Sequence, residues 1–257
     1  MIMNHLLLNN TSQYHKGCVK VVEHLSEKYS ITESRYTRDL LDDIDWSKYT
    51  YVTLNGEGTM HHSGKTSIRL LTALRKAQEA GCVTQLVNSV WQEMTNEFDD
   101  VLHKLTRVHV REVYSQQELK RKHGVDAMVR PDASYYVDVP VHEYKHVPVY
   151  EGQYMIAHKH RARGKYPRID IFTQEWTEIV NRLRNCDLLI TGRHHEMYAA
   201  CVAECRFLVT PGNTWKNEGL LKSAGVTIPF DIEAVRSGHY DEEYQKLWDY
   251  LKKFKKK

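Results

Sequence analysis

No stretch of this 257-residue sequence approaches the roughly 18 unbroken apolar residues that a transmembrane helix needs. The first residues, MIMNHLLLNN, lack the basic region and the long apolar core of a secretory signal. There are only five cysteines, an odd number, and no C-x-x-C pair occurs among them. We therefore expect a cytoplasmic protein with reduced thiols.

The sequence also has little excess charge, because its formal net charge is only +3. An apolar fraction of 41% and a charged fraction of 27% are typical of a globular chain long enough for one large or two modest domains. The basic residues gather in KHRARGKYPR (159–168) and in the final YLKKFKKK (250–257). These segments would suit contact with phosphate backbones or anionic lipid, and the alternative is a solvated helix end.

Hydrophobic periodicity predicts strands that alternate with helices along most of the chain. Strands are expected at 3–8, 49–54, 82–89, 107–112, 135–141, 152–158, 187–191, 206–210 and 226–228. Helices are expected at 18–28, 67–80, 97–105, 115–124, 174–185, 195–204, 215–224 and 241–254. This α/β pattern predicts parallel sheets in two Rossmann-like domains, residues 1–145 and 146–257, which face a cleft and end in a closing C-terminal helix.

Five polar clusters directly follow predicted strands, and ligands of parallel sheets bind at the carboxyl ends of strands. The clusters are NNTSQYHKG, NGEGTMHH, VREVYS, TGRHH and PGNTWKNEG. The first two contribute candidate residues Asn10, Thr11, His15, Gly56, Glu57 and Gly58. The glycines of NGEGTMHH would let backbone N–H groups approach a ligand, although a tight strand-to-helix connection explains them equally well.

The segment TGRHH contains the strongest candidate residues. Arg193 opens a helix whose N-terminus favours anions, and His194 and His195 follow it in different directions. A histidine with a pKa near neutrality can donate or accept a proton during transfer to a hydroxyl. The spacing around Glu196 is not H-E-x-x-H, so a zinc site of that kind is not expected.

Two further clusters supply groups that could bind an anion. Arg111 in VREVYS could bind a carboxylate or phosphate bidentately, and the alternative is a structural ion pair. PGNTWKNEG offers Asn213, Thr214, Lys216 and Glu218 at a helix start, which suits a phosphate, with plain N-capping as the alternative.

These clusters, in this order, resemble the polysaccharide pyruvyl transferase family. The matching stretches are VTLNGEGTMHH, VHVREVYSQQEL, RPDASY, LLITGRHHEMYAACVAECRFLVTP and GNTWKNEGLLKSAG, within Tyr51 to Val226. The resemblance implies a GT-B-like fold and transfer of a pyruvyl group from phosphoenolpyruvate to a sugar. It places the family's active-site Arg-x-His pair on Arg193 and His195, and a second donor contact on Arg111.

The resemblance further implies that the arginine binds the donor's carboxylate or phosphate and that the histidine is the general acid. Asp132 falls in the family's P-D stretch. The first loop, NNTSQYHKG, departs from the N-x-G-D-like turn common in the family, so the acceptor cannot be carried over. We expect the N-terminal half to face the acceptor and the C-terminal half to bind the donor.

The first hypothesis is thus a transferase that moves a group from an anionic phosphorylated donor to a saccharide hydroxyl. No metal ion and no cofactor beyond the donor are required by these residues. The second hypothesis is a nucleotide-sugar glycosyltransferase of GT-B type, whose acceptor is a saccharide or a hydroxylated base in phage-like DNA. The third is a non-catalytic binding module that has kept the fold.

Overall fold

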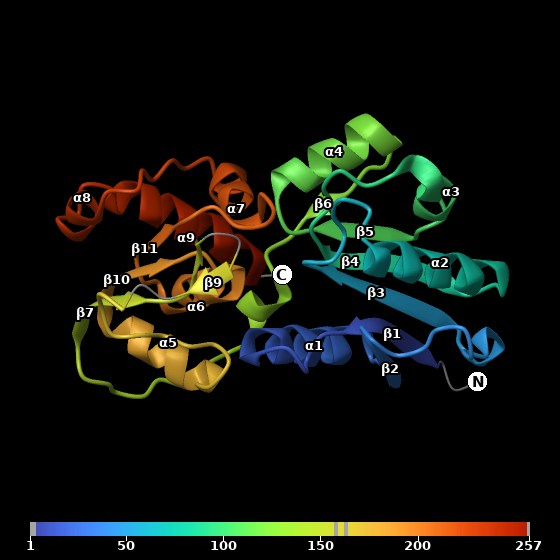
Figure 1. The fold of residues 1–257 in the computed structure, drawn as a ribbon, viewed down its shortest axis with the longest axis horizontal. Coiled ribbons are helices and arrows are strands. Elements are labelled where there is room, and N and C mark those ends of the chain that lie inside the picture. The colour runs from blue at the N-terminus through green and yellow to red at the C-terminus, as the bar shows by residue number, and fades with distance from the viewer. Residues whose placement is uncertain (1–3, 157–158, 162–163, 256–257) are drawn as a thin grey trace. The chain divides into compact units, whose positions relative to one another are not determined.

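The computed structural model describes residues 4–156, 159–161 and 164–255 (Figure 1). The chain divides into two compact units, each with its own hydrophobic core. Unit 1 comprises Met1–Gln13 and Val21–Pro131, and unit 2 comprises Tyr14–Lys20 and Asp132–Lys257. The predicted join after residue 145 falls inside unit 2 by this division, and the short segment Tyr14–Lys20 also groups with unit 2.

Unit 1 is built on a six-stranded parallel sheet with the order β2-β1-β3-β4-β5-β6. Its strands are β1 (His5–Asn10), β2 (Glu33–Tyr36), β3 (Tyr51–Glu57), β4 (Val83–Ser89), β5 (Arg107–Val110) and β6 (Met128–Val129). The three central strands are buried along almost their whole length, as parallel strands covered on both faces should be. Because all six strands are parallel, their carboxyl ends lie at one edge of the sheet.

The helices of unit 1 are α1 (Lys16–Tyr29), α2 (Lys65–Glu79), α3 (Asp99–Leu102) and α4 (Val113–His123), and α1 begins within the residues of unit 2. Helix α2 ends at Glu79, and Gly81 follows it with a φ of 85°, which is unfavourable for other residues. The N-cap of α4 is Glu112, whose carboxylate accepts hydrogen bonds from the N–H groups of Tyr114 and Ser115.

Unit 2 contains a smaller parallel sheet with the order β11-β10-β7 and a separate antiparallel pair, β8 with β9. Its strands are β7 (Val147–Glu151), β8 (Tyr154–Ile156), β9 (Lys159–Arg161), β10 (Cys186–Thr191) and β11 (Phe207–Val209). Its helices are α5 (Trp176–Arg184), α6 (His194–Ala203), α7 (Lys216–Ala224), α8 (Ile232–Arg236) and α9 (Asp241–Lys255). Helix α5 packs on α6, and α7 packs on α9, the predicted C-terminal helix.

The sequence prediction of an α/β protein with parallel sheets is confirmed, two predicted strands are wrong, and one predicted helix is shorter than expected. Residues 135–141 do not form a strand, because Asp132 caps a 3-10 turn, Ala133–Tyr136, that is followed by irregular chain. Residues 226–228 pair with no described strand, and 97–105 forms a 3-10 turn and the single turn of α3. Strand β2, which is polar and partly exposed, gave no hydrophobic signal and was not predicted.

None of the described helices is long and apolar enough to cross a membrane. The two basic segments are only partly described. Ala162 and Arg163 of the predicted basic loop, and Lys256 and Lys257 of the tail, lie outside the described residues. The remainder of the tail continues helix α9.

Candidate functional site in unit 2

The turn between β10 and α6 places the sequence TGRHH at the carboxyl end of the central strand of the small sheet. Thr191 is the last residue of the strand, and its hydroxyl accepts a hydrogen bond from Arg193 N–H at 2.9 Å. Gly192 is required here because a Cβ at this position would lie 2.6 Å from the Thr210 hydroxyl. Tight packing therefore fixes where α6 begins.

Arg193 is the N-cap residue of α6 and is half-buried. Its Nε donates to the side-chain oxygen of Gln153 at 2.6 Å, and its guanidinium lies 4.6 Å from the centre of the Phe172 ring. Burial lowers the pKa of Arg193, and the charge of Glu196 opposes this shift. Among the described residues no carboxylate forms an ion pair with Arg193, so its positive charge, at a helix N-terminus, favours an external anion.

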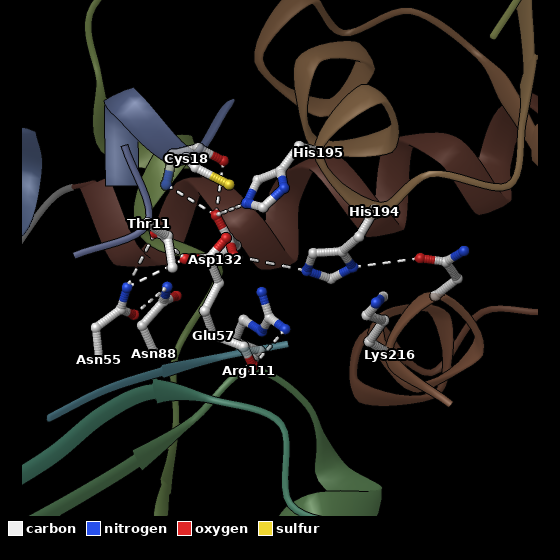
Figure 2. Close-up of polar contacts among 12 residues, drawn as sticks. Thr11, Cys18, Asn55, Glu57, Asn88, Arg111, Asp132, His194, His195 and Lys216 are labelled. Atoms are coloured by element: carbon white, nitrogen blue, oxygen red, sulfur yellow. Dashed lines mark hydrogen bonds and ion pairs between the residues drawn. The ribbon is translucent and has the colours of Figure 1, made fainter. Parts of the chain in front are cut away.

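Asp132 lies beside both histidines of the motif (Figure 2). One of its carboxylate oxygens is 3.6 Å from His194 Nε2, and the other is 3.6 Å from His195 Nε2. All three side chains are buried, with Asp132 fully enclosed. Asp132 also accepts hydrogen bonds from the N–H and the hydroxyl of Ser134, which fix the carboxylate in place. One buried carboxylate, that of Asp132, thus lies between two imidazole rings.

His194 and His195 have different further neighbours. His194 Nδ1 donates to the Asn217 side-chain oxygen at 3.2 Å, and Asn217 donates in turn to the carbonyl of Gly192. His195 instead packs against His15, with ring centres 4.9 Å apart. His194 is therefore tied to the start of α7, and His195 to the start of α1.

The start of α1 completes this side of the site. Cys18 N–H donates to His15 Nδ1, and Cys18 Sγ lies 3.4 Å from His15 Nε2. A Cβ on Gly17 would lie 2.6 Å from the Cβ of His195, so only glycine allows this approach. Burial lowers the pKa of His15 to about 2, and the charges of His195, Arg193 and Lys216 contribute in the same direction. Burial therefore keeps the His15 ring neutral.

Glu196, in the first turn of α6, is fully buried next to Arg193 and the histidines in the chain. Its carboxyl group accepts hydrogen bonds from the Thr191 hydroxyl at 2.5 Å and from Gln153 N–H at 3.1 Å. Burial raises its pKa to about 7, and those two hydrogen bonds and the charge of Arg193 oppose the shift. Glu196 thus links the segment between β7 and β8 to the first turn of α6.

The predicted anion-binding residues at α7 are only partly brought to the histidines. Lys216 influences His15 electrostatically, and its Nζ donates to Asn213 Oδ1 at 2.9 Å. Thr214 is buried, and Glu218 lies half-buried one residue beyond Asn217. Asn217 of α7, which was not among the predicted site residues, contacts His194.

The predicted loop residues of unit 1 form a separate polar network at the carboxyl edge of the six-stranded sheet. The Thr11 hydroxyl donates to the Glu57 carboxylate, and Asn55 donates to the same carboxylate at 3.1 Å. Asn10 donates to the Ser34 hydroxyl, and Gly58 directly follows β3. Gly56 packs so closely on Ser89 that a side chain would collide with it.

Backbone geometry marks the same edge of unit 1. Asn9, Glu57 and Asn88 have positive φ angles of 64°, 33° and 54° at the ends of β1, β3 and β4. Positive φ angles are uncommon for residues other than glycine, although Asn tolerates them better than most, and they cluster at functional sites. Arg111 is buried here and donates to the carbonyl of Glu57 at 2.7 Å. Its role as a donor contact stays a prediction, as do the acceptor roles of Thr11, Glu57 and their neighbours.

Unit 2 therefore unites Arg193, His194, His195 and Asp132 with His15, which sequence reasoning had placed among the acceptor-side loops. Such a set can hold an anion and move a proton. Sequence reasoning missed Gly17, Cys18, Gln153 and Asn217. The compact H-K-G-C sequence at 15–18 was the available signal, since residues three apart share a helix face.

No family model and no curated protein matches the chain. Solved structures resemble its fold at low sequence identity. A functionally uncharacterised protein of Klebsiella pneumoniae aligns with a TM-score of 0.61 and 12% identity over 86% of this chain and 88% of its own.

Two further structures are sugar-nucleotide enzymes by description. A candidate UDP-N-acetylglucosamine 2-epimerase of Listeria monocytogenes aligns with a TM-score of 0.55 and 9% identity over 96% of this chain and 91% of its own. The UDP-GlcNAc 2-epimerase of Neisseria meningitidis bound to UDP-GlcNAc aligns with a TM-score of 0.55 and 10% identity over 99% of this chain and 98% of its own. The chain thus has an α/β fold similar to these GT-B-like proteins.

Proposed function

We propose that this chain is a transferase that binds an anionic phosphorylated donor in unit 2 and transfers a group to a sugar hydroxyl. The observation that carries the proposal is the convergence of Arg193, at the N-terminus of α6, with the His194–Asp132–His195 cluster. A cation at a helix N-terminus binds carboxylate or phosphate, and a carboxylate-flanked imidazole transfers protons.

The preferred reaction is pyruvyl transfer from phosphoenolpyruvate, the chemistry that the sequence resemblance implies. Two hydroxyl oxygens of the acceptor bond to C2 of the enol, and the C2–O bond to phosphate breaks. Of the two hydroxyl protons released, one ends on C3, which becomes a methyl group, and the other leaves with inorganic phosphate. In this scheme His195 carries the hydroxyl proton to C3, Asp132 orients the ring, and Arg193 binds the donor anion.

The second candidate is an enzyme that acts on a nucleotide sugar. The specific observation in its favour is the fold similarity to a UDP-GlcNAc 2-epimerase bound to UDP-GlcNAc, which spans nearly the whole chain. A diphosphate would meet the same guanidinium and helix N-terminus. The polar network around Glu57 in unit 1 would serve as the acceptor side in either reaction.

Thermal unfolding with added ligands separates the two candidates, because a ligand that binds only the folded chain raises Tm. The probes are phosphoenolpyruvate, UDP-GlcNAc and UDP, each tested on wild type and on Arg193→Gln. The matched control is Lys222→Gln, an exposed cation of α7. A rise with phosphoenolpyruvate that is lost in Arg193→Gln and kept in Lys222→Gln supports pyruvyl transfer.

A rise only with the uridine nucleotides would replace pyruvyl transfer by the nucleotide-sugar reaction. If Arg193→Gln left every ligand shift unchanged, the anion site assigned here would be wrong. A DNA acceptor would reveal itself through salt-dependent retention of the protein on DNA.

A further inference from the structure

We propose that His15, Cys18 and His195 form a binding site for a thiophilic divalent metal ion such as Zn²⁺. One ligand atom from each residue, two imidazole nitrogens and one sulfur, lies within 4.8 Å of the others. Cys18 and His195 are buried, and His15 is partly so. All three belong to unit 2.

The spacing of the ligand atoms fits tetrahedral coordination. With zinc–sulfur and zinc–nitrogen bonds of about 2.3 and 2.1 Å, a tetrahedral edge between sulfur and nitrogen measures roughly 3.5 Å. Cys18 Sγ lies 3.4 Å from His15 Nε2, so this pair already has the separation of a metal-bound pair. Since no two ligand atoms are more than 4.8 Å apart, bringing the third to the same separation requires a movement of at most about 1.3 Å, within reach of a side-chain rotation.

The backbone around the cluster holds the ligands together. His15 and Cys18 lie three residues apart at the start of α1 and therefore share one face. Gly17 lies between them and allows the helix start to approach His195, since a Cβ there would lie 2.6 Å from His195 Cβ. Ile171 O accepts the hydrogen bond of Lys16 N–H at 3.1 Å, which fixes the first turn of α1 within unit 2.

The chemistry of the donor set selects the class of metal. One thiolate and two imidazoles suit Zn²⁺, Co²⁺ or Cu²⁺ and not the oxygen-seeking Mg²⁺ or Ca²⁺. Asp132, with an oxygen 3.6 Å from His195 Nε2, adds a negative charge beside the cluster, and carboxylates of this kind commonly support metal-bound histidines. Three protein ligands leave one coordination position for water or an anion.

A bound metal would occupy a lone pair of His195. Metal binding and proton transfer by the same ring nitrogen exclude each other, so a filled site would inhibit the transferase. This consequence rests on the proposed function, whereas the metal site itself does not. Its test therefore uses a readout that requires neither donor nor acceptor.

The experiment is a Co²⁺ titration of the untagged full chain, stripped with a chelator and kept reduced with a phosphine. We expect a thiolate-to-cobalt charge-transfer band that saturates at one ion per chain and disappears when Zn²⁺ is added. Cys18→Ser should lose the band, and His15→Gln should weaken Co²⁺ binding at least tenfold. The matched control is Cys82→Ser, a buried thiol of unit 1, which should keep the band.

Circular dichroism checks that each variant is folded. If Cys18→Ser does not fold, the Co²⁺ affinity of His15→Gln tests the metal site instead. Absence of the charge-transfer band in wild type would overturn the proposal. So would a band retained in folded Cys18→Ser, or equal Co²⁺ affinities for wild type and His15→Gln.

Discussion

The carboxyl group of Glu196 occupies the position where a side chain at Gly152 would begin. Gly152 follows β7, and Glu196 lies in the first turn of α6, so this contact closes the carboxyl end of the small sheet. The carboxylate can approach so closely only because residue 152 has no Cβ. The glycine and the acid therefore act as one structural element beneath Arg193 and the histidines.

Gly152→Ala should consequently destabilise unit 2. The added methyl group must displace the buried Glu196 carboxyl from its hydrogen bonds with Thr191 and Gln153, and overpacking of this kind costs roughly 1–3 kcal/mol. Urea denaturation followed by tryptophan fluorescence measures the loss. Gly212→Ala is the matched control, since its Cβ would meet nothing closer than 3.5 Å. Equal stabilities for the two variants would contradict the assignment.

The hydroxyl group of Tyr244 links helix α9 to the edge strand β11. Tyr244 Oη accepts a hydrogen bond from Phe207 N–H at 3.2 Å and donates one to the Phe207 carbonyl. Tyr244→Phe leaves both buried backbone groups without this partner, so we expect a loss of roughly 1–3 kcal/mol in the free energy of unfolding. The control is Tyr240→Phe, half-buried nearby, whose hydroxyl makes no hydrogen bond in the described part of the chain. Similar losses for both variants would refute the role of Tyr244.

The pattern of apolar residues was sufficient to predict the parallel α/β architecture and the motif at the end of β10. It was insufficient for β2, because a partly exposed edge strand such as ESRY carries no hydrophobic alternation. The same reasoning failed at 135–141, where the side chain of Asp132 caps a 3-10 turn in spite of the β-branched and aromatic residues that follow. Local polar contacts decided the structure there.

The sequence could likewise predict only some of the residues of the candidate site. Arg193, His194 and His195 are neighbours in sequence and were recognisable as one motif. Asp132, His15 and Cys18 reach them only through tertiary packing, by way of the 3-10 turn at 133–136 and the start of α1. No spacing rule connects residue 15 with residue 195, so a single sequence could not reveal the cluster.

His109 should make the protein sensitive to acid. Burial, followed by the charges of Arg107, Lys28 and Arg130, lowers its pKa from 6.5 to about 4 in the folded state. Between those two values the unfolded chain binds more protons than the folded chain, so stability is complete above pH 6.5 and falls as the pH drops toward 4. His109→Gln should reduce the slope of Tm against pH in this window.

Thermal unfolding at pH values from 4 to 7.5 provides that slope for wild type and variant. His62→Gln, at an exposed position of unit 1, should leave it unchanged. If His109→Gln and wild type lost stability in parallel, the buried ring would not be the origin of the acid sensitivity.

Asp132 provides the sharpest test of the proposed proton transfer. Its carboxylate lies 3.6 Å from both His194 and His195, and we assign it as a positioning residue for the reacting imidazole. Asp132→Asn keeps an oxygen for the Ser134 hydrogen bonds but removes the charge, so stability should change little, whereas Asp132→Ala loses the cap and about 1 kcal/mol. In a transfer assay with the donor identified by thermal shift, Asp132→Asn should lower kcat by roughly 10²-fold or more and leave KM nearly unchanged. A change in KM alone would assign Asp132 to donor binding, and an unchanged kcat in folded Asp132→Asn would remove the histidine pair from the chemistry.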